Sequence, residues 1–96
     1  MFVSTARIAT DNPQRLITRL CKHWSHKFAV SFDAQQGEIH LSLGHCLLEA
    51  LDDGLQVRLQ AAEDEQIQRL QTVVGEHLQR MAGAPLPEFV WSRQAS

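Results

Sequence analysis

Hydrophobic and polar residues alternate along several short stretches of the chain. A period of two is typical of a β-strand with one buried face. The alternating stretches are residues 2–9, 28–33, 38–43 and 55–59.

Two pairs of residues between these stretches have the composition of tight hairpin turns. Gly44-His45 places glycine first, as in a type II′ turn, and Asp53-Gly54 is the signature of a type I′ turn. Residues 28–61 are therefore predicted to form a four-stranded antiparallel meander.

Two other segments repeat their apolar residues with the period of a helix. In the first, Asp11 or Asn12 is the expected cap, Pro13 lies in the first turn, and the helix is expected to end near residue 26. The second begins in the acidic residues 63–65 and is ended by glycine and proline at residues 83–85. Residues 89–91 are expected to form a last strand.

The predicted order is strand, helix, four-stranded meander, helix, strand. This order is typical of an α+β fold, in which the two helices cover one face of a mainly antiparallel sheet as a two-layer sandwich. The length favours a single domain over residues 1–96. The pattern does not place the first and last strands in the sheet.

The predicted turns and a loop at residues 34–37 also fix which side chains lie side by side. They place one polar row on the outer face of the sheet, formed by Ser31, His40, Glu49 and Arg58. One interpretation is a solvated ladder of charge pairs. The other is a polar strip that binds an anionic ligand, in which Glu49 raises the pKa of His40.

Composition narrows the functional class. The formal charge is −2 with five histidines neutral, and residues 1–30 carry +4 whereas residues 31–96 carry −6. A net negative chain without an aromatic stacking face argues against nucleic acid. Because there is no apolar run of membrane length and no secretory signal, a cytoplasmic protein with two free thiols is expected.

Basic and imidazole side chains gather at the end of the first predicted helix, at Lys22, His23, His26 and Lys27. They either compensate the partial negative charge of the helix end or bind a ligand or partner. His23 and His26 are three residues apart on one rim, so they are also weak candidates for a metal pair.

His77 falls within the apolar face of the second predicted helix. It is either a neutral core imidazole or, if it opens onto a pocket, a ligand-binding group or general base. Cys21 and Cys46 both fall on apolar faces and are interpreted as core residues.

A larger pattern runs through the chain in four parts: Leu20-Cys21-Lys22-His23-Trp24-x-His26-Lys27, Gly44-x-Cys46-x-Leu48-x-Ala50, Val73-Val74-x-x-His77-Leu78-x-Arg80, and Trp91. The pattern resembles the bacterial domain-of-unknown-function 2218 family, which has no established activity. The resemblance implies a context in iron and siderophore uptake and directs attention to the first helix end together with His77.

The leading hypothesis is a small non-enzymatic domain that binds an anionic ligand, a metal chelate or a protein partner, and the cofactor, if any, is unknown. One alternative is a homodimeric interaction module, because Leu47 and Leu51 interrupt the polar face of the sheet. Another is an enzyme that uses His77 or His40 as its general base.

Overall fold

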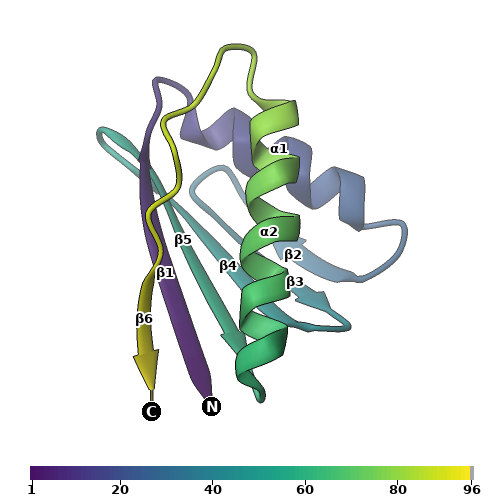
Figure 1. The fold of residues 1–96 in the computed structure, drawn as a ribbon. Coiled ribbons are helices and arrows are strands. Elements are labelled where there is room, and N and C mark those ends of the chain that lie inside the picture. The colour runs from purple at the N-terminus through teal and green to yellow at the C-terminus, as the bar shows by residue number, and fades with distance from the viewer. Residues whose placement is uncertain (96) are drawn as a thin grey trace.

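The computed structural model describes residues 1–95, with side chains through Gln94. Six strands form one antiparallel sheet, and two helices complete an α+β fold, as the sequence predicted (Figure 1). The elements are β1 (Phe2–Ala9), α1 (Pro13–Trp24), β2 (Ala29–Phe32), β3 (Gln36–Leu41), β4 (Gly44–Leu51), β5 (Gly54–Ala61), α2 (Asp64–Met81) and β6 (Ser92–Ala95).

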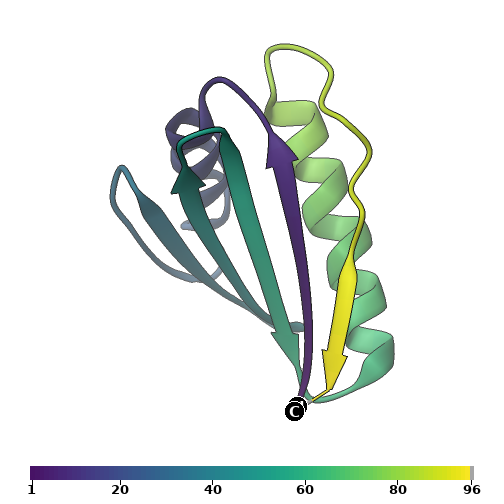
Figure 2. The ribbon, with the colours of Figure 1, turned by 90° about the vertical axis from the view of Figure 1, so that its left-hand side faces the viewer.

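The strand order is β2-β3-β4-β5-β1-β6, so the predicted meander forms four consecutive strands of the six-stranded sheet. The first strand pairs with β5 on one side and with β6 on the other, where Phe2 lies opposite Ala95. The beginning of the chain and its last described strand therefore lie side by side at one end of the sheet (Figures 1 and 2).

Both helices pack on the same face of the sheet, which we call the inner face (Figure 2). Each begins at a polar cap: the Asn12 side chain accepts a hydrogen bond from the Arg15 N–H, and the Gln66 side chain accepts one from the Glu63 N–H. Their apolar faces and the inner-facing strand residues form one buried core. Within that core, the Ser4 hydroxyl donates a hydrogen bond to Gln71 of α2 over 2.8 Å.

The turns differ in position from the prediction. The β3–β4 turn lies at residues 42–43 rather than 44–45, and the β4–β5 turn lies at residues 52–53 rather than 53–54. The loop between β2 and β3 spans residues 33–35 rather than 34–37, and Phe32 pairs with Gly37. In each strand pair, the sum of the numbers of two opposite residues differs from the predicted sum by an even number. Each residue therefore stays on its predicted face of the sheet, whereas its neighbours on the adjacent strand change.

A lack of space explains why glycine is needed at positions 44 and 54, which begin strands and do not lie in the turns. A Cβ at Gly44 would lie 2.2 Å from the Gln60 carbonyl oxygen, and one at Gly54 would lie 2.1 Å from the Ile8 carbonyl oxygen. Both glycines therefore open a strand where a neighbouring backbone approaches closely.

The last strand also lies later than predicted. Residues 89–91 are irregular, and β6 begins at Ser92. Phe89 instead lies against Gly75 of α2, where its ring would be 3.7 Å from an added Cβ, and its ring is 5.8 Å from that of Trp91. The aromatic residues that led to the prediction of a strand at 89–91 instead pack along α2.

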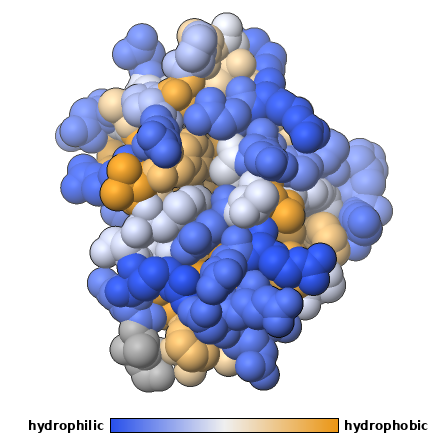
Figure 3. All heavy atoms as spheres, viewed as in Figure 1, coloured by the Kyte–Doolittle hydropathy of each residue, from blue (hydrophilic) through white to orange (hydrophobic). Residues whose placement is uncertain are grey.

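From the helix side, the surface is mainly hydrophilic, with separate small hydrophobic patches (Figure 3).

Candidate functional site

A pocket of about 440 Å³ lies where the end of α1, the middle of α2 and the β3–β4 turn meet. Its lining combines apolar side chains with two imidazoles and one ammonium group. The lining residues are His23, Trp24, Lys27, Phe28, Leu41, Ser42, Leu43, Val73 and His77. We call it the helix-junction pocket.

Local structure brings residues from the end of α1 into this pocket. The backbone N–H groups of Lys27 and Phe28 both donate to the Trp24 carbonyl, at 3.0 and 2.8 Å, and this turns the chain from α1 toward β2. Lys27 and Phe28 consequently lie beside Trp24, with the Lys27 Nζ 5.7 Å from the centre of the Phe28 ring.

His77 is half-buried between two rings of α1. Its ring centre is 5.3 Å from that of His23 and 4.8 Å from that of Trp24. The sequence placed His77 on the apolar side of α2, and the structure shows that it also opens onto a pocket.

One hydrogen bond determines which nitrogen of His77 is free. The Nδ1 atom lies 2.7 Å from the Val73 carbonyl oxygen, which can only accept, so Nδ1 carries the proton. In the neutral ring, Nε2 then keeps its lone pair. His77 can therefore accept a proton or a hydrogen bond, or ligate a metal, through Nε2.

The charges around the pocket favour an anion. Lys27 supplies a full positive charge, and no acidic side chain is among the lining residues. Lys22 and His26, the other two residues of the predicted basic cluster, are exposed and do not line the pocket. The structure thus pairs His23 with His77 and not with His26.

Residues 1–95 contain no group of three or more His, Cys, Asp or Glu side chains placed to hold a metal ion. Cys21 and Cys46 are fully buried free thiols in the core, as predicted, and burial raises the pKa of both.

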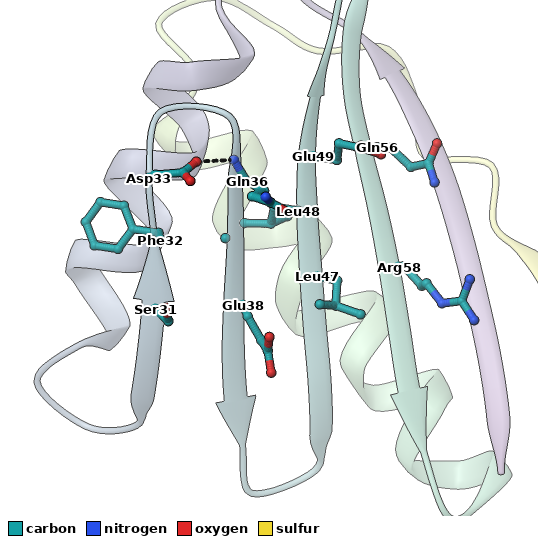
Figure 4. A pocket seen from close by; sticks show the side chains of 11 residues that line it. Ser31, Phe32, Asp33, Gln36, Glu38, Leu47, Leu48, Glu49, Gln56 and Arg58 are labelled. Atoms are coloured by element: carbon teal, nitrogen blue, oxygen red, sulfur yellow. Dashed lines mark hydrogen bonds between the residues drawn. The ribbon is translucent and has the colours of Figure 1, made fainter.

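A second hollow, of about 460 Å³, lies on the outer face of the sheet (Figure 4). The predicted polar row is not formed there. Ser31 lies opposite Glu38 and Arg58 lies opposite Leu47, so the apolar Leu47 occupies the position between the acid and the base. The predicted neighbours were wrong because they depended on the misplaced turns.

His40 also has different partners from those expected. Its Nε2 is 2.7 Å from a carboxylate oxygen of Glu38, whereas Glu49 lies opposite Gln36 and Gln56. His45 lies in β4, and its ring centre is 4.3 Å from that of His40. Glu38, and not Glu49, is therefore the charge partner of His40.

No pattern in the sequence pointed directly to the rest of the pocket lining. Leu41, Ser42 and Leu43 reach the pocket only because the β3–β4 turn lies at residues 42–43. Phe28 was expected to begin the strand at residues 28–33, whereas β2 begins at Ala29. The approach of α2 to α1 could not be read from either helix alone.

Comparison with known proteins identifies the family. Residues 5–92 match the family described as "Uncharacterized protein conserved in bacteria (DUF2218)". The chain belongs to the DUF2218 family. This agrees with the four-part pattern in the sequence, which spans nearly the same residues.

The DUF2218 fold is also found in a solved structure, described as the NMR structure of PA4090 from Pseudomonas aeruginosa. That protein is 35% identical in sequence, with a TM-score of 0.78, and the match covers 98% of this chain and 96% of the other. No curated protein matches the chain. In the part of the chain that is described, no helix combines the length and the apolar character needed to cross a membrane.

Proposed function

We propose that this DUF2218 chain is a small non-enzymatic binding domain whose helix-junction pocket takes an aromatic anion. The observation that carries the proposal is the convergence of His23, Lys27 and His77 on a pocket otherwise lined mainly by apolar side chains. A concave apolar site with a few convergent polar groups is the usual form of a small-molecule site.

The polar groups specify the kind of ligand. Lys27 offers a positive charge to a carboxylate or phenolate, and a lone pair on Nε2 of His77 accepts from a donor such as a hydroxyl group. Phe28, Val73 and the leucines of the lining offer apolar surface to a ring. An aromatic hydroxycarboxylate satisfies all three requirements.

The cellular setting is part of the proposal. We place the protein in the cytoplasm, and two buried thiols without a disulfide support a reducing compartment. The link to iron and siderophore metabolism remains an expectation drawn from family resemblance, and it is compatible with an aromatic hydroxycarboxylate as ligand.

The test is titration of the protein with salicylate, followed by calorimetry and amide chemical shifts. We expect Lys27→Ala and His77→Leu each to weaken binding at least tenfold, because the first removes the positive charge and the second removes the hydrogen-bond acceptor. Lys22→Ala and His26→Ala are matched controls from the same helix end and should leave the affinity unchanged. Equal effects of Lys27→Ala and Lys22→Ala would contradict a defined pocket.

Recovery of the ligand distinguishes binding from catalysis. We expect salicylate and its simple esters to be recovered unchanged after incubation. Conversion that is lost in His77→Gln would instead favour the enzyme, with His77 as its general base.

Self-association is the second candidate, and exposure of an aromatic ring favours it. Phe32 is 39% exposed on the edge strand β2, and Leu47 interrupts the polar outer face. Sedimentation at several concentrations tests this: a dimer that Phe32→Ser converts to a monomer would support the interaction module, and a monomer at every concentration would reject it.

A further inference from the structure

We propose that the helix-junction pocket is a two-histidine metal site, in which His23 and His77 bind a divalent transition metal that enters together with an aromatic chelating anion. The inference rests on the proposed function, because the chelator occupies the same pocket as the aromatic anion. It adds a metal and a chemical requirement that the ligand carry two adjacent donor atoms.

The separation of the two rings is the first argument. With zinc–nitrogen bonds of about 2.0–2.1 Å and a ring centre about 1.1 Å behind the nitrogen, two imidazoles on one ion have centres roughly 4.5–5.2 Å apart. The ring centres of His23 and His77 are 5.3 Å apart. The observed spacing lies just above the upper end of this range, which corresponds to a tetrahedral angle.

The hydrogen bond of His77 is the second, independent argument. A histidine that ligates a metal usually donates its other N–H to a backbone carbonyl or a carboxylate, which fixes the tautomer and orients the ring. His77 already donates Nδ1–H to the Val73 carbonyl over 2.7 Å. This leaves Nε2 as the metal-ligating nitrogen.

The number of protein ligands explains why a chelator is needed. Among the described residues no third His, Cys, Asp or Glu is placed to complete the site. A tetrahedral ion held by two imidazoles therefore has two open positions, which a bidentate chelator fills. The negative charge of that chelator lies near Lys27, and its ring contacts the apolar lining.

The outer face carries another histidine pair, which serves as the matched control. The ring centres of His40 and His45 are 4.3 Å apart, just below the same range, but Nε2 of His40 already lies 2.7 Å from a carboxylate oxygen of Glu38. If any exposed imidazole bound zinc, both histidine pairs would bind it. A difference in zinc binding between the two pairs therefore distinguishes a specific site from adventitious binding.

The experiment compares zinc alone, zinc with picolinate, and zinc with nicotinate. Nicotinate has the charge and size of picolinate, but its donor atoms are too far apart to chelate. We expect zinc to bind at least tenfold more tightly with picolinate than alone or with nicotinate. Calorimetry gives the affinities, and nitrogen chemical shifts of the imidazoles identify the ligating residues.

The variants decide between sites. His23→Ala and His77→Gln should each remove the gain from picolinate, and His40→Ala/His45→Ala should keep it. Two histidine variants are used because His77 also packs on Trp24, whereas His23 is exposed. Equal zinc affinity with picolinate and nicotinate, or loss of binding in the His40→Ala/His45→Ala variant, would overturn the metal site.

The two proposals fail separately. Metal-free salicylate binding that depends on Lys27, without any gain from picolinate, would leave the proposed function in place and reject the metal site. Loss of zinc–picolinate binding in His23→Ala, without any metal-free binding of salicylate, would support the metal site and reject the simpler anion pocket.

Discussion

The two thiols show how strongly a single side chain can depend on its surroundings. Cys21 on α1 and Cys46 on β4 are both fully buried in the core. Burial raises the pKa of Cys21 to about 11, and it raises the pKa of Cys46 further, with a smaller contribution from the charge of Cys21. Both groups are therefore protonated, unreactive thiols at neutral pH, and they act as small hydrophobic residues.

This predicts a loss of stability at alkaline pH. In the unfolded chain a thiol ionises near pH 8.5, so unfolding releases protons above that pH. Because the pKa of each thiol is raised in the folded protein, the two neutral thiols contribute fully to the free energy of unfolding below about pH 8.5. This contribution is lost as the pH rises. For Cys21 the loss continues to about pH 11. We expect a slope of about 1.4 kcal/mol per pH unit for each thiol.

Urea unfolding between pH 7.5 and 10.5 measures this slope. Cys46→Ala creates a cavity and lowers stability at every pH, but it should reduce the slope by the contribution of one thiol. An unchanged slope in Cys46→Ala would show that other groups cause the pH dependence.

At the scale of elements, the alternation of apolar and polar residues predicted the strands better than the composition of the turns did. The faces of the meander strands were predicted correctly, because each error in register was an even number of residues. The neighbours across strands were wrong, because glycine was interpreted as a turn residue. In the structure, Gly44 and Gly54 are required by contact with an adjacent backbone, and a contact between distant segments cannot be read from local sequence.

The close approach at Gly44 gives a prediction with an internal control. An alanine Cβ at this position would lie 2.2 Å from the Gln60 carbonyl oxygen, and the backbone φ is +156°. We expect Gly44→Ala to lower the free energy of unfolding by about 2 kcal/mol or more, as strained backbone substitutions do.

Gly83→Ala is the matched control, because nothing lies within 4 Å of the added Cβ. It should change the free energy of unfolding by less than about 0.5 kcal/mol. Equal losses for the two variants in urea unfolding would contradict the steric explanation.

The candidate site was predictable in part, for a related reason. Residue types and helical spacing selected His23, Lys27 and His77, all of which line the pocket. The same reasoning also selected Lys22 and His26, which do not, because the sequence does not show which side of α1 faces α2. That side is set by the packing of both helices on the sheet.

At the scale of the whole molecule, the first strand of the chain lies inside the sheet and not at its edge. β1 lies between β5 and β6, and Phe2 is opposite Ala95, so the two ends of the described chain are neighbours. The ion pair between Arg93 and Asp64 also ties β6 to the start of α2.

This arrangement predicts that a circular permutant will fold. Adjacent antiparallel strand ends are joined by loops of two to five residues in ordinary hairpins. A short glycine-rich linker between the present ends, with new ends between Gly83 and Ala84, opens an exposed irregular segment. We expect cooperative unfolding within about 2 kcal/mol of the parent, since the same contacts are kept.

A permutant opened between Cys46 and Leu47 is the corresponding control. It interrupts β4, which pairs with strands on both sides, and should not unfold cooperatively. Circular dichroism with urea unfolding compares the two, and loss of cooperativity in both would contradict the predicted tolerance.

The position of β1 also has a consequence for synthesis. Of the six described strands β1 is synthesised first, and its partners come later: β5 follows more than forty residues after it, and β6 is the last strand described. Until then its backbone is unpaired and its apolar residues are uncovered, the condition in which chains aggregate. The domain must therefore complete its fold late, and protection of the nascent N-terminal strand would matter more than the speed of forming either helix.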